Sequence, residues 1–249
     1  MGLRARLAAL ADKNDVVYSF FTTPAAWFSA AVLVVLVAAA LLAPWLSSVN
    51  PFDLGSLDVT DAHLPPAWTE EGDARFWLGT DDQGRDLLSA ILYGLRLSLS
   101  ISLVSVVLSI VIGVGLGVTA GFAGGWIDTV LMRVCDVMLS FPAILVALLA
   151  DGILRSAFPG AAHESVAYFV LIFAITLSGW VPYARTVRGL TLVEKGKEFV
   201  MAAELIGEKK LTVMRRHILP NVLGPVFVLA AVNVATAVMT EATLSFLGV

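Results

Sequence analysis

Few residues in this 249-residue chain have the type and spacing that chemistry needs. The three histidines, His63, His163 and His217, are scattered, and each is most simply a surface residue; a metal shared by the first two is the lesser alternative. A single cysteine, Cys135, excludes an internal disulfide and a zinc site built from several thiolates. His-Glu-x-x-His, Gly-x-Ser-x-Gly and Gly-x-x-x-x-Gly-Lys-Ser/Thr motifs are absent from the sequence. We therefore predict no catalytic residue, no metal site and no nucleotide site of that kind.

Two polar residues stand out in an otherwise apolar stretch near the end of the sequence. Asn233 lies within a long charge-free run, and Glu241 follows that run directly. A polar residue deep in an apolar segment is a functional candidate, so Asn233 could line a solute path or join two helices by a hydrogen bond. Glu241 could line the mouth of the same path. Arg133 and Asp136, spaced i, i+3, can pair on one helical face, and we interpret that pair as structural.

The polar segment 185–219 is too patterned to be a plain linker. Residues 198–206 (EFVMAAELI) favour a helix with Phe199, Ala202, Ala203 and Ile206 near one face, and Gly207 is a typical helix stop. A second short helix is expected over 209–218, ending before Pro220. Two short helices joined at a glycine could lie against a soluble partner. An amphipathic element resting on lipid headgroups is the alternative.

The elements that would position these residues are membrane helices. The chain is 58% hydrophobic and 14% charged, whereas a soluble domain has about a quarter charged residues. Runs of roughly 20 apolar residues, the length that crosses a bilayer, occur at about 25–46, 97–122, 129–150, 165–184 and 220–240. Because backbone groups in lipid must be satisfied internally, we expect an all-α integral membrane protein. The first run is too long for a signal peptide and is interpreted as an uncleaved span.

The distribution of Lys and Arg predicts the orientation. With residues 1–24 in the cytoplasm, residues 47–96 form an extracytoplasmic loop and residues 97–249 hold the other four spans and the cytoplasmic segment 185–219. The inner side then carries twelve basic residues and the outer side four: inside, Arg4, Arg6, Lys13, Arg133, Arg185, Arg188, Lys195, Lys197, Lys209, Lys210, Arg215 and Arg216; outside, Arg75, Arg85, Arg96 and Arg155. The net charge of −4 argues against nucleic acid as a partner.

The second run contains glycines that favour close helix packing. Gly113, Gly117 and Gly121 are spaced four residues apart, so they form one stripe on a helix and let another backbone approach. Packing within the chain is the simpler interpretation, and a dimer seam is the alternative. Gly115 lies off the stripe.

The segment 185–219 also resembles a known motif. Met201-Ala202-Ala203, then Gly207, then Leu219-Pro220 resembles the Glu-Ala-Ala loop of ABC importer permeases, with Met201 in place of the glutamate and His217 in place of an aliphatic residue. In that family the loop docks on an ATPase subunit. The resemblance implies that the ATPase-coupling residues are Glu198, Met201, Ala202, Ala203, Gly207, Leu219 and Pro220.

A second resemblance covers residues 76–249. The stretch 78–89 (LGTDDQGRDLLS), followed by 93–99 (YGLRLSL), resembles the segment before the second span in the dipeptide/oligopeptide/nickel permease family. Residues 124–128 (GGWID), 140–142 (SFP) and 241–248 (EATLSFLG) are similar, in order and spacing, to the C-type subunit of that family. Its signature in the outer segment corresponds to Gly79, Thr80, Asp81, Gly84, Arg85 and Asp86. The family pattern has six spans, so we expect a sixth beyond the five present.

The resemblance implies a bacterial inner-membrane permease with the type I ABC importer fold. Its partners would be a second, B-type permease, two ATP-binding subunits that hold ATP and Mg²⁺, an extracytoplasmic binding protein and membrane lipid. This chain would hold no cofactor, and it would move di- or oligopeptides by alternating access. The acidic loop 47–96 would contact the binding protein or the partner permease, or be a plain solvated loop. Alternatives are a nickel or haem importer of the same family, or an ion-gradient-driven secondary transporter.

Overall fold

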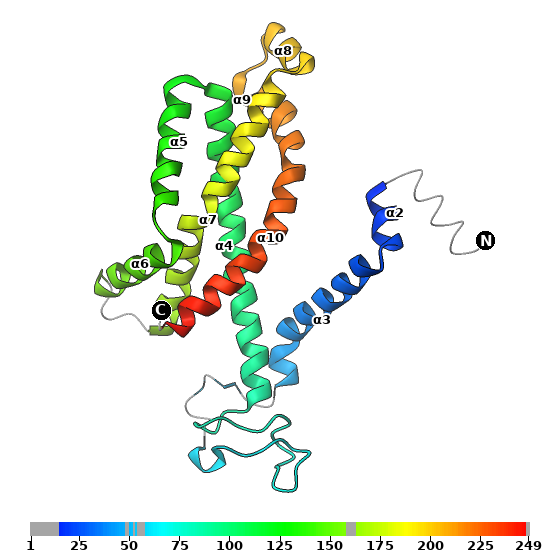
Figure 1. The fold of residues 1–249 in the computed structure, drawn as a ribbon, viewed down its shortest axis with the longest axis vertical. Helices are drawn as coiled ribbons and strands as arrows, with labels where there is room; N and C mark the ends of the chain where they lie inside the picture. Colours follow the sequence, from blue (N-terminus) through cyan, green and yellow to red (C-terminus); the bar gives the residue numbers. More distant parts are fainter. Residues whose placement is uncertain (1–14, 48–49, 52, 54–57, 158–162, 248–249) are drawn as a thin grey trace, which may run out of the picture. The chain divides into compact units, whose positions relative to one another are not determined.

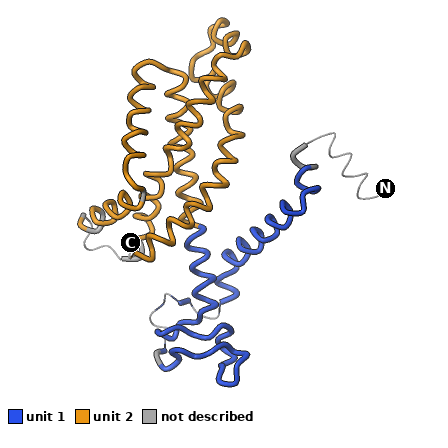
Figure 2. The backbone as a smooth tube through the Cα atoms, in the orientation of Figure 1, with its two compact units in different colours: residues 1–99 blue, residues 100–249 orange. Residues whose placement is uncertain are grey.

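The computed structural model describes residues 15–247 except 48–49, 52, 54–57 and 158–162. The described residues form helices joined by turns, and the one β-bridge among them pairs Thr80 with Asp86. The chain divides into two compact units, residues 1–99 and residues 100–249 (Figure 2). Figure 1 shows the order of the helices along the chain. The all-α prediction is confirmed for the described residues.

The described part of the first unit holds two helices, a loop and the start of a third helix. The short α2 covers Asp15–Thr22, and α3 covers Pro24–Leu46 with Pro24 in its first turn, where a missing N–H costs nothing. The helix α3 contains no charged residue and corresponds to the predicted first span. A loop with the short helix η2 (Val59–Asp61) leads to α4, Leu87–Ala123. The helix α4 therefore begins well before the expected residue 97.

The second unit is a helical bundle. After α4 come α5 (Gly125–Ser140), α6 (Ala143–Ala157), α7 (His163–Lys195), the short α8 (Glu198–Leu205) and α9 (Lys210–Val213), η3 (Met214–Ile218) and α10 (Leu219–Phe246). Gly124 is the one residue between α4 and α5, and Gly125 is the first residue of α5; with φ of 64° and 56° they make the reversal between the two helices. Such positive φ values favour glycine, which has no Cβ to clash.

The predicted third span, 129–150, is not one helix. It is broken at Phe141 and Pro142 into α5 and α6, whose axes differ by 92°. The reason is local: a proline disfavours the helical conformation of the residue before it and cannot donate to the previous turn. By length and composition, four helices among the described residues can each cross a membrane, and the bent pair gives a fifth crossing if it counts as one span.

The glycine stripe of α4 packs on α7 within the second unit. A Cβ at Gly113 would lie 2.5 Å from the Trp180 carbonyl oxygen, and one at Gly117 would lie 2.6 Å from the Ala184 carbonyl oxygen. At Gly121 it would meet the Thr191 side chain at 2.7 Å. These contacts confirm packing within the chain, because the surface that the glycines open is filled by α7.

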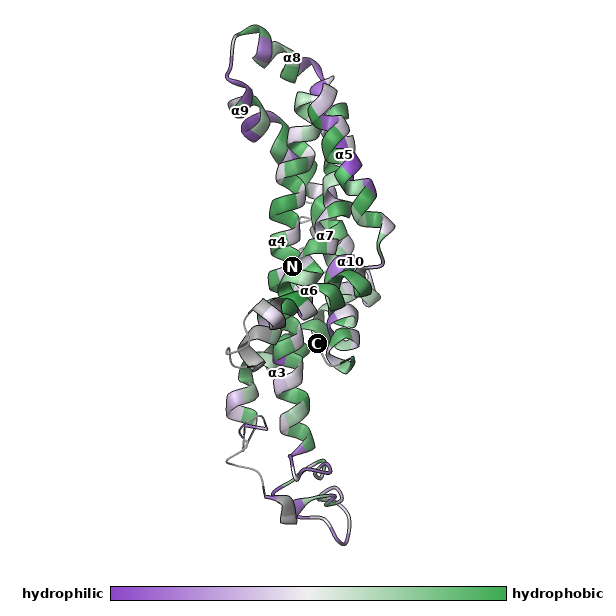
Figure 3. Cartoon of the chain, turned by 90° about the vertical axis from the view of Figure 1, so that its left-hand side faces the viewer, coloured by the Kyte–Doolittle hydropathy of each residue, from purple (hydrophilic) through white to green (hydrophobic). Residues whose placement is uncertain are grey.

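Three buried apolar clusters hold the bundle together, and α7 contributes to all of them. Leu171 and Ile175 belong to the first cluster, Tyr183 and Val187 to the second, and Val181 to the third. Figure 3 shows apolar residues along the long helices and polar residues concentrated around α8 and α9. The second cluster continues from the bundle into this polar end, where it anchors the candidate site.

Candidate functional site

Two lysines fix the junction of α4, α7 and α8. The Lys195 ammonium donates to the carbonyl oxygen of Phe122 at 2.7 Å, so a cation covers the carboxyl end of α4. Lys197, the residue before α8, pairs with the buried Glu194 at 2.6 Å. The predicted loop 185–219 is therefore helical up to Lys195, and α8 follows after a two-residue turn.

The carboxyl end of α8 is closed by Gly207. The Gly207 N–H donates to the Glu204 carbonyl at 3.0 Å, and the Glu208 N–H donates to the Ala203 carbonyl at 3.1 Å. This pair of bonds is the Schellman motif, which needs a left-handed residue after the helix. Gly207 supplies it with φ of 89°. The helix predicted over 198–206 and its stop at Gly207 are confirmed, and the structure ends the helix at Leu205.

One face of α8 is buried and the rest is exposed. Val200 and Ala203 lie in the second apolar cluster together with Val213 and Ile218. On the exposed side Leu205 and Ile206 are 88% and 83% accessible. Of the residues predicted to couple to an ATPase, Ala203 is buried, Leu219 is half-buried, and the exposed ones are Glu198, Met201, Ala202, Gly207 and Pro220. The helix thus presents large apolar side chains, Phe199 and Met201 among them, that the rest of the described structure leaves exposed.

The second short helix does not end before Pro220, as expected, but continues into α10. The π-helical turn η3, in which the Leu219 N–H donates to the Met214 carbonyl, lies directly before Pro220. A proline has no N–H and clashes with the carbonyl four residues earlier, and the wider turn accommodates both effects. The Asn221 side chain donates to the His217 carbonyl at 2.8 Å and so satisfies a carbonyl beside the proline.

His217 links this turn to the end of α8. Its Nε2 lies 3.1 Å from a carboxylate oxygen of Glu208, and its ring is 6.3 Å from the ring of Phe199. The histidine that departs from the family pattern therefore holds α8 and η3 together.

Two ion pairs between α5 and α7 were not predicted. Arg188 makes two hydrogen bonds to the carboxylate of Asp128, at 2.9 and 2.6 Å, and Arg185 pairs with Asp136. The expected pair of Arg133 with Asp136 has a distance of 3.9 Å and is secondary. The sequence signal for these pairs is that the predicted third span carries two aspartates, Asp128 and Asp136, at or near its start, and that two arginines follow the fourth apolar run.

The two candidate path residues lie on α10. Asn233 is half-buried and faces the buried Tyr183 hydroxyl of α7, although the two groups do not reach hydrogen-bond geometry. Glu241 is only 3% accessible. One of its carboxylate oxygens accepts a hydrogen bond from Ser245 at 2.9 Å, and the other has no partner among the described residues. In this conformation Glu241 is enclosed in the bundle and is not exposed at a mouth.

The signature residues before α4 build a polar loop. Asp81 accepts hydrogen bonds from the N–H groups of Gln83 and Arg85, both at 2.9 Å, and from the Arg85 guanidinium at 2.6 Å. Partial burial works to raise the pKa of Asp81, but these bonds outweigh it and hold the pKa below its usual value. Asp86 accepts from the N–H of Ser89 at 3.1 Å and thereby caps the start of α4. Gly79 and Gly84 turn the backbone with φ of 81° and 77°.

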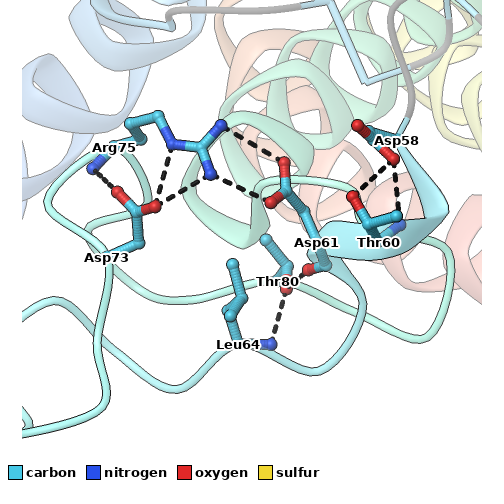
Figure 4. A network of polar contacts seen from close by, with 7 residues as sticks. All are labelled: Asp58, Thr60, Asp61, Leu64, Asp73, Arg75 and Thr80. Carbon is cyan, nitrogen blue, oxygen red and sulfur yellow. Dashed lines mark hydrogen bonds and ion pairs between the residues drawn. The ribbon is translucent and has the colours of Figure 1, made fainter.

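A second network fixes the same loop (Figure 4). The Arg75 guanidinium pairs with Asp61 at 2.9 Å and with Asp73 at 2.8 Å. The hydrogen bonds from Arg75 lower the pKa of Asp73, and the two carboxylates raise the pKa of Arg75. Thr80 donates to the Asp61 carbonyl and accepts from the N–H of Leu64 at 2.9 Å. All six signature residues thus have a structural place in the loop or at its junction with α4.

Comparison with protein families decides what this bundle is. Residues 113–249, more than half of the chain, match the family model described as binding-protein-dependent transport system inner membrane component. The chain belongs to that family. Residues 14–66 of this permease match a second model, described as the N-terminal TM domain of oligopeptide transport permease C. The permease is therefore an all-α, multi-pass integral membrane protein. Among its described residues no three His, Cys, Asp or Glu side chains gather as metal ligands would.

Several curated proteins are similar to the permease over most of its length. It is 32% identical to the oligopeptide transport system permease protein OppC of Bacillus subtilis, over 94% of this chain and 71% of the relative. It is 34% identical to the dipeptide transport system permease protein DppC of Haemophilus influenzae, over 84% and 66%. It is 36% identical to the glutathione transport system permease protein GsiD of Shigella flexneri, over 87% and 65%. The chain thus spans about two thirds of the length of these relatives.

Proposed function

We propose that this permease is the C-type transmembrane subunit of an ATP-driven ABC importer that carries di- or oligopeptides into the cytoplasm. The names of its relatives support a peptide substrate, since they are described as oligopeptide, dipeptide and glutathione permeases. Membership of the binding-protein-dependent family supports an importer that receives its solute from an extracytoplasmic binding protein.

The observation that carries the coupling role is the two-sided character of α8. Val200 and Ala203 anchor the helix in the bundle, while Leu205 and Ile206 project apolar surface outward. Exposed large apolar side chains at the polar end of a membrane bundle are typical of a protein interface. The proposed occupant is an ATPase subunit, and the proposed coupling residues are the seven identified above, from Glu198 to Pro220.

The orientation follows from the basic residues. The end of the second unit that holds α8, α9 and η3 also holds Lys195, Lys197, Lys209 and Lys210. Because Lys and Arg concentrate on the cytoplasmic side of membrane proteins, this end and the N-terminus face the cytoplasm in the proposal. The loop 47–96 then faces the outside, where it would meet the binding protein or the partner permease.

In this assembly the chain itself is not catalytic. A second, B-type permease would complete the path, and two ATP-binding subunits would bind and hydrolyse ATP with Mg²⁺. Closure of the ATPase pair would move α8. The motion of α8 would then move the bundle, because Val200 and Ala203 of α8 pack in the second apolar cluster with residues of α4 and α7, and Lys197 pairs with Glu194 of α7. The permease would thereby change between inward-open and outward-open arrangements.

The test is to distort α8 without unfolding the bundle. Gly207→Val places a β-branched side chain at φ of 89°, where such residues are strained, although the space around Gly207 is open. Gly196→Val is the matched control, since Gly196 lies in the turn before α8 without a positive φ and its Cβ would meet only ordinary contact at 3.6 Å. Peptide uptake and ATP hydrolysis are measured in proteoliposomes that hold the complete importer.

The expected result is that G207V keeps membrane insertion and ATP hydrolysis but loses the link between hydrolysis and peptide uptake, while G196V keeps both. Uptake by G207V that equals the wild type would refute the coupling role. Uptake that continues without ATP and stops when the ion gradient is removed would refute the importer proposal and favour a secondary transporter.

A further inference from the structure

A basic pocket lies on the exposed side of the helix that precedes α10. It is open, has a volume of about 400 Å³, and is lined by Leu211, Thr212, Arg215 and Arg216. All four residues are exposed. The pocket is formed by α9 and η3, and none of its four lining residues is among the seven proposed to couple to an ATPase.

No described residue compensates the positive charge of this pocket. Neither Arg215 nor Arg216 forms an ion pair with any described residue. Between the end of α8 and Ile218 the only acidic residue is Glu208, and its carboxylate is held by His217 at 3.1 Å. Lys209 and Lys210 add two further cations next to the pocket. The site therefore has two guanidinium groups available for an anion, and guanidinium binds phosphate oxygens in a bidentate way.

The position of the pocket along the helix indicates which kind of anion it would bind. The charge-free run of this span begins at Ile218 and continues to Thr240. At a rise of 1.5 Å per residue, Arg215 and Arg216 lie only about 3–5 Å along the axis beyond that run. The headgroup layer on each side of the hydrocarbon is about 5–7 Å thick. Both arginines are thus at the depth of lipid phosphates.

The remaining lining residues suit a lipid better than a free anion. Leu211 is 66% accessible and adds apolar surface at the edge of the pocket. The Thr212 hydroxyl is a further hydrogen-bond donor beside the guanidinium groups. A phospholipid headgroup offers a phosphate to the arginines and acyl chains to the apolar residues. Basic groups near a membrane surface attract anionic lipid by about 1 kcal/mol each.

We propose that the pocket formed by Leu211, Thr212, Arg215 and Arg216 binds the phosphate headgroup of an anionic phospholipid. Binding holds the junction of η3 and α10 at the membrane surface. It thereby fixes the depth from which α8 projects. The lipid contact uses Arg215 and Arg216, whereas the proposed ATPase contact of α8 uses other side chains, so different variants test the two proposals.

Native mass spectrometry of the purified full chain with phosphatidylglycerol or phosphatidylcholine tests this proposal. We expect phosphatidylglycerol to bind preferentially, and R215Q/R216Q to weaken its binding about thirtyfold, the equivalent of about 1 kcal/mol for each arginine. R215K/R216K, which keeps the charge, should retain most of the binding. The control R75Q removes an exposed arginine of the loop before α4, which lies away from every apolar run and is paired with two aspartates, and it should bind as the wild type does.

Other outcomes overturn the proposal. Equal binding of the two lipids, or equal loss in R215Q/R216Q and in the control, would show that no headgroup site exists there. Displacement of the lipid by an equal concentration of inorganic phosphate would show a site for the free anion. Unchanged lipid binding in R215Q/R216Q, together with loss of the ATPase subunits from the purified complex, would assign the arginines to a protein partner. The G207V variant, in contrast, should leave lipid binding unchanged even if the coupling proposal fails.

Discussion

Adding a single methyl group to the glycine stripe of α4 should separate it from α7, and the neighbouring glycine provides the control. A Cβ at Gly117 would lie 2.6 Å from the Ala184 carbonyl oxygen, 2.9 Å from Val187 Cβ and 3.1 Å from the Arg188 nitrogen. Ordinary contacts begin near 3.4 Å. Since two of these neighbours are backbone atoms, no side chain can rotate away, and the helices must move apart by about 1 Å.

The free-energy cost of forcing the two helices apart can be isolated by comparing Gly117→Ala with Gly115→Ala. A Cβ at Gly115 meets no atom within 4 Å, so Gly115→Ala changes only helix propensity, which favours alanine by about 1 kcal/mol. Gly117→Ala has the same gain but also overpacks the seam, which costs about 1–3 kcal/mol. The difference between the two variants removes the propensity term, and we expect G117A to be less stable than G115A by about 1–3 kcal/mol.

Reversible unfolding in mixed detergent micelles, followed by far-UV circular dichroism, measures this difference. G115A should unfold at the same or a higher denaturant concentration than the wild type, and G117A at a lower one. Equal stability of the two variants would refute the reasoning, because it would mean that α4 and α7 do not approach as closely as the contacts at Gly117 require.

Three further predictions follow from the ion pairs and the exposed surfaces. Asp128→Asn should lower the free energy of unfolding by about 1–2 kcal/mol, because it weakens the two hydrogen bonds of Arg188 at a partly buried site. The same micelle assay measures this loss. The loss should be smaller when Asp128→Asn is made in the Arg188→Ala variant, in which these hydrogen bonds are already absent. The network around Arg75 should stabilise the loop above the ordinary carboxylate pKa, and this stabilisation should be lost as the pH falls through the lowered pKa of Asp73. Amide hydrogen exchange of the loop, corrected for intrinsic rates, should therefore be slow from pH 7 to 5 and rise below about pH 4. A loop that is equally protected at pH 3 would contradict this. The orientation is tested with single cysteines in a variant that lacks Cys135. Leu205→Cys should react with a membrane-impermeant maleimide only in inside-out vesicles, and Trp77→Cys only in right-side-out vesicles. The reverse pattern would contradict the proposed orientation.

The parts of the fold that follow from local chemistry were predictable. Hydropathy located the helices of the spans, and the helix formers of 198–206 with Gly207 located α8. The break at Phe141 and Pro142 was missed, because an apolar run was given more weight than a proline that interrupts it. The ends of α4 and α7 were missed for a different reason. Both helices continue beyond the apolar run, and hydropathy detects only the part of a helix that lipid surrounds.

The parts that depend on contacts between distant residues were not predictable. Asp136 has a nearby arginine in sequence, Arg133, but a partner on α7, Arg185, lies closer in space. Likewise Glu241 looks accessible in sequence, since it follows the apolar run, yet it is enclosed in the bundle. A sequence predicts which side of a helix faces its neighbours only where one side is clearly more apolar than the other. Helices that are apolar all round have no such side.

The participation of α7 in all three apolar clusters limits how this molecule can move. Closely packed interiors do not deform gradually, so none of the clusters can shift past α7 without losing its contacts. In a conformational change that preserves the three clusters, the parts of α4, α7 and α10 beyond residue 100 must therefore move together as a rigid body. Opening and closing of a solute path would then take place against another subunit, with this bundle acting as one wall of the passage and leaving its own interior unchanged.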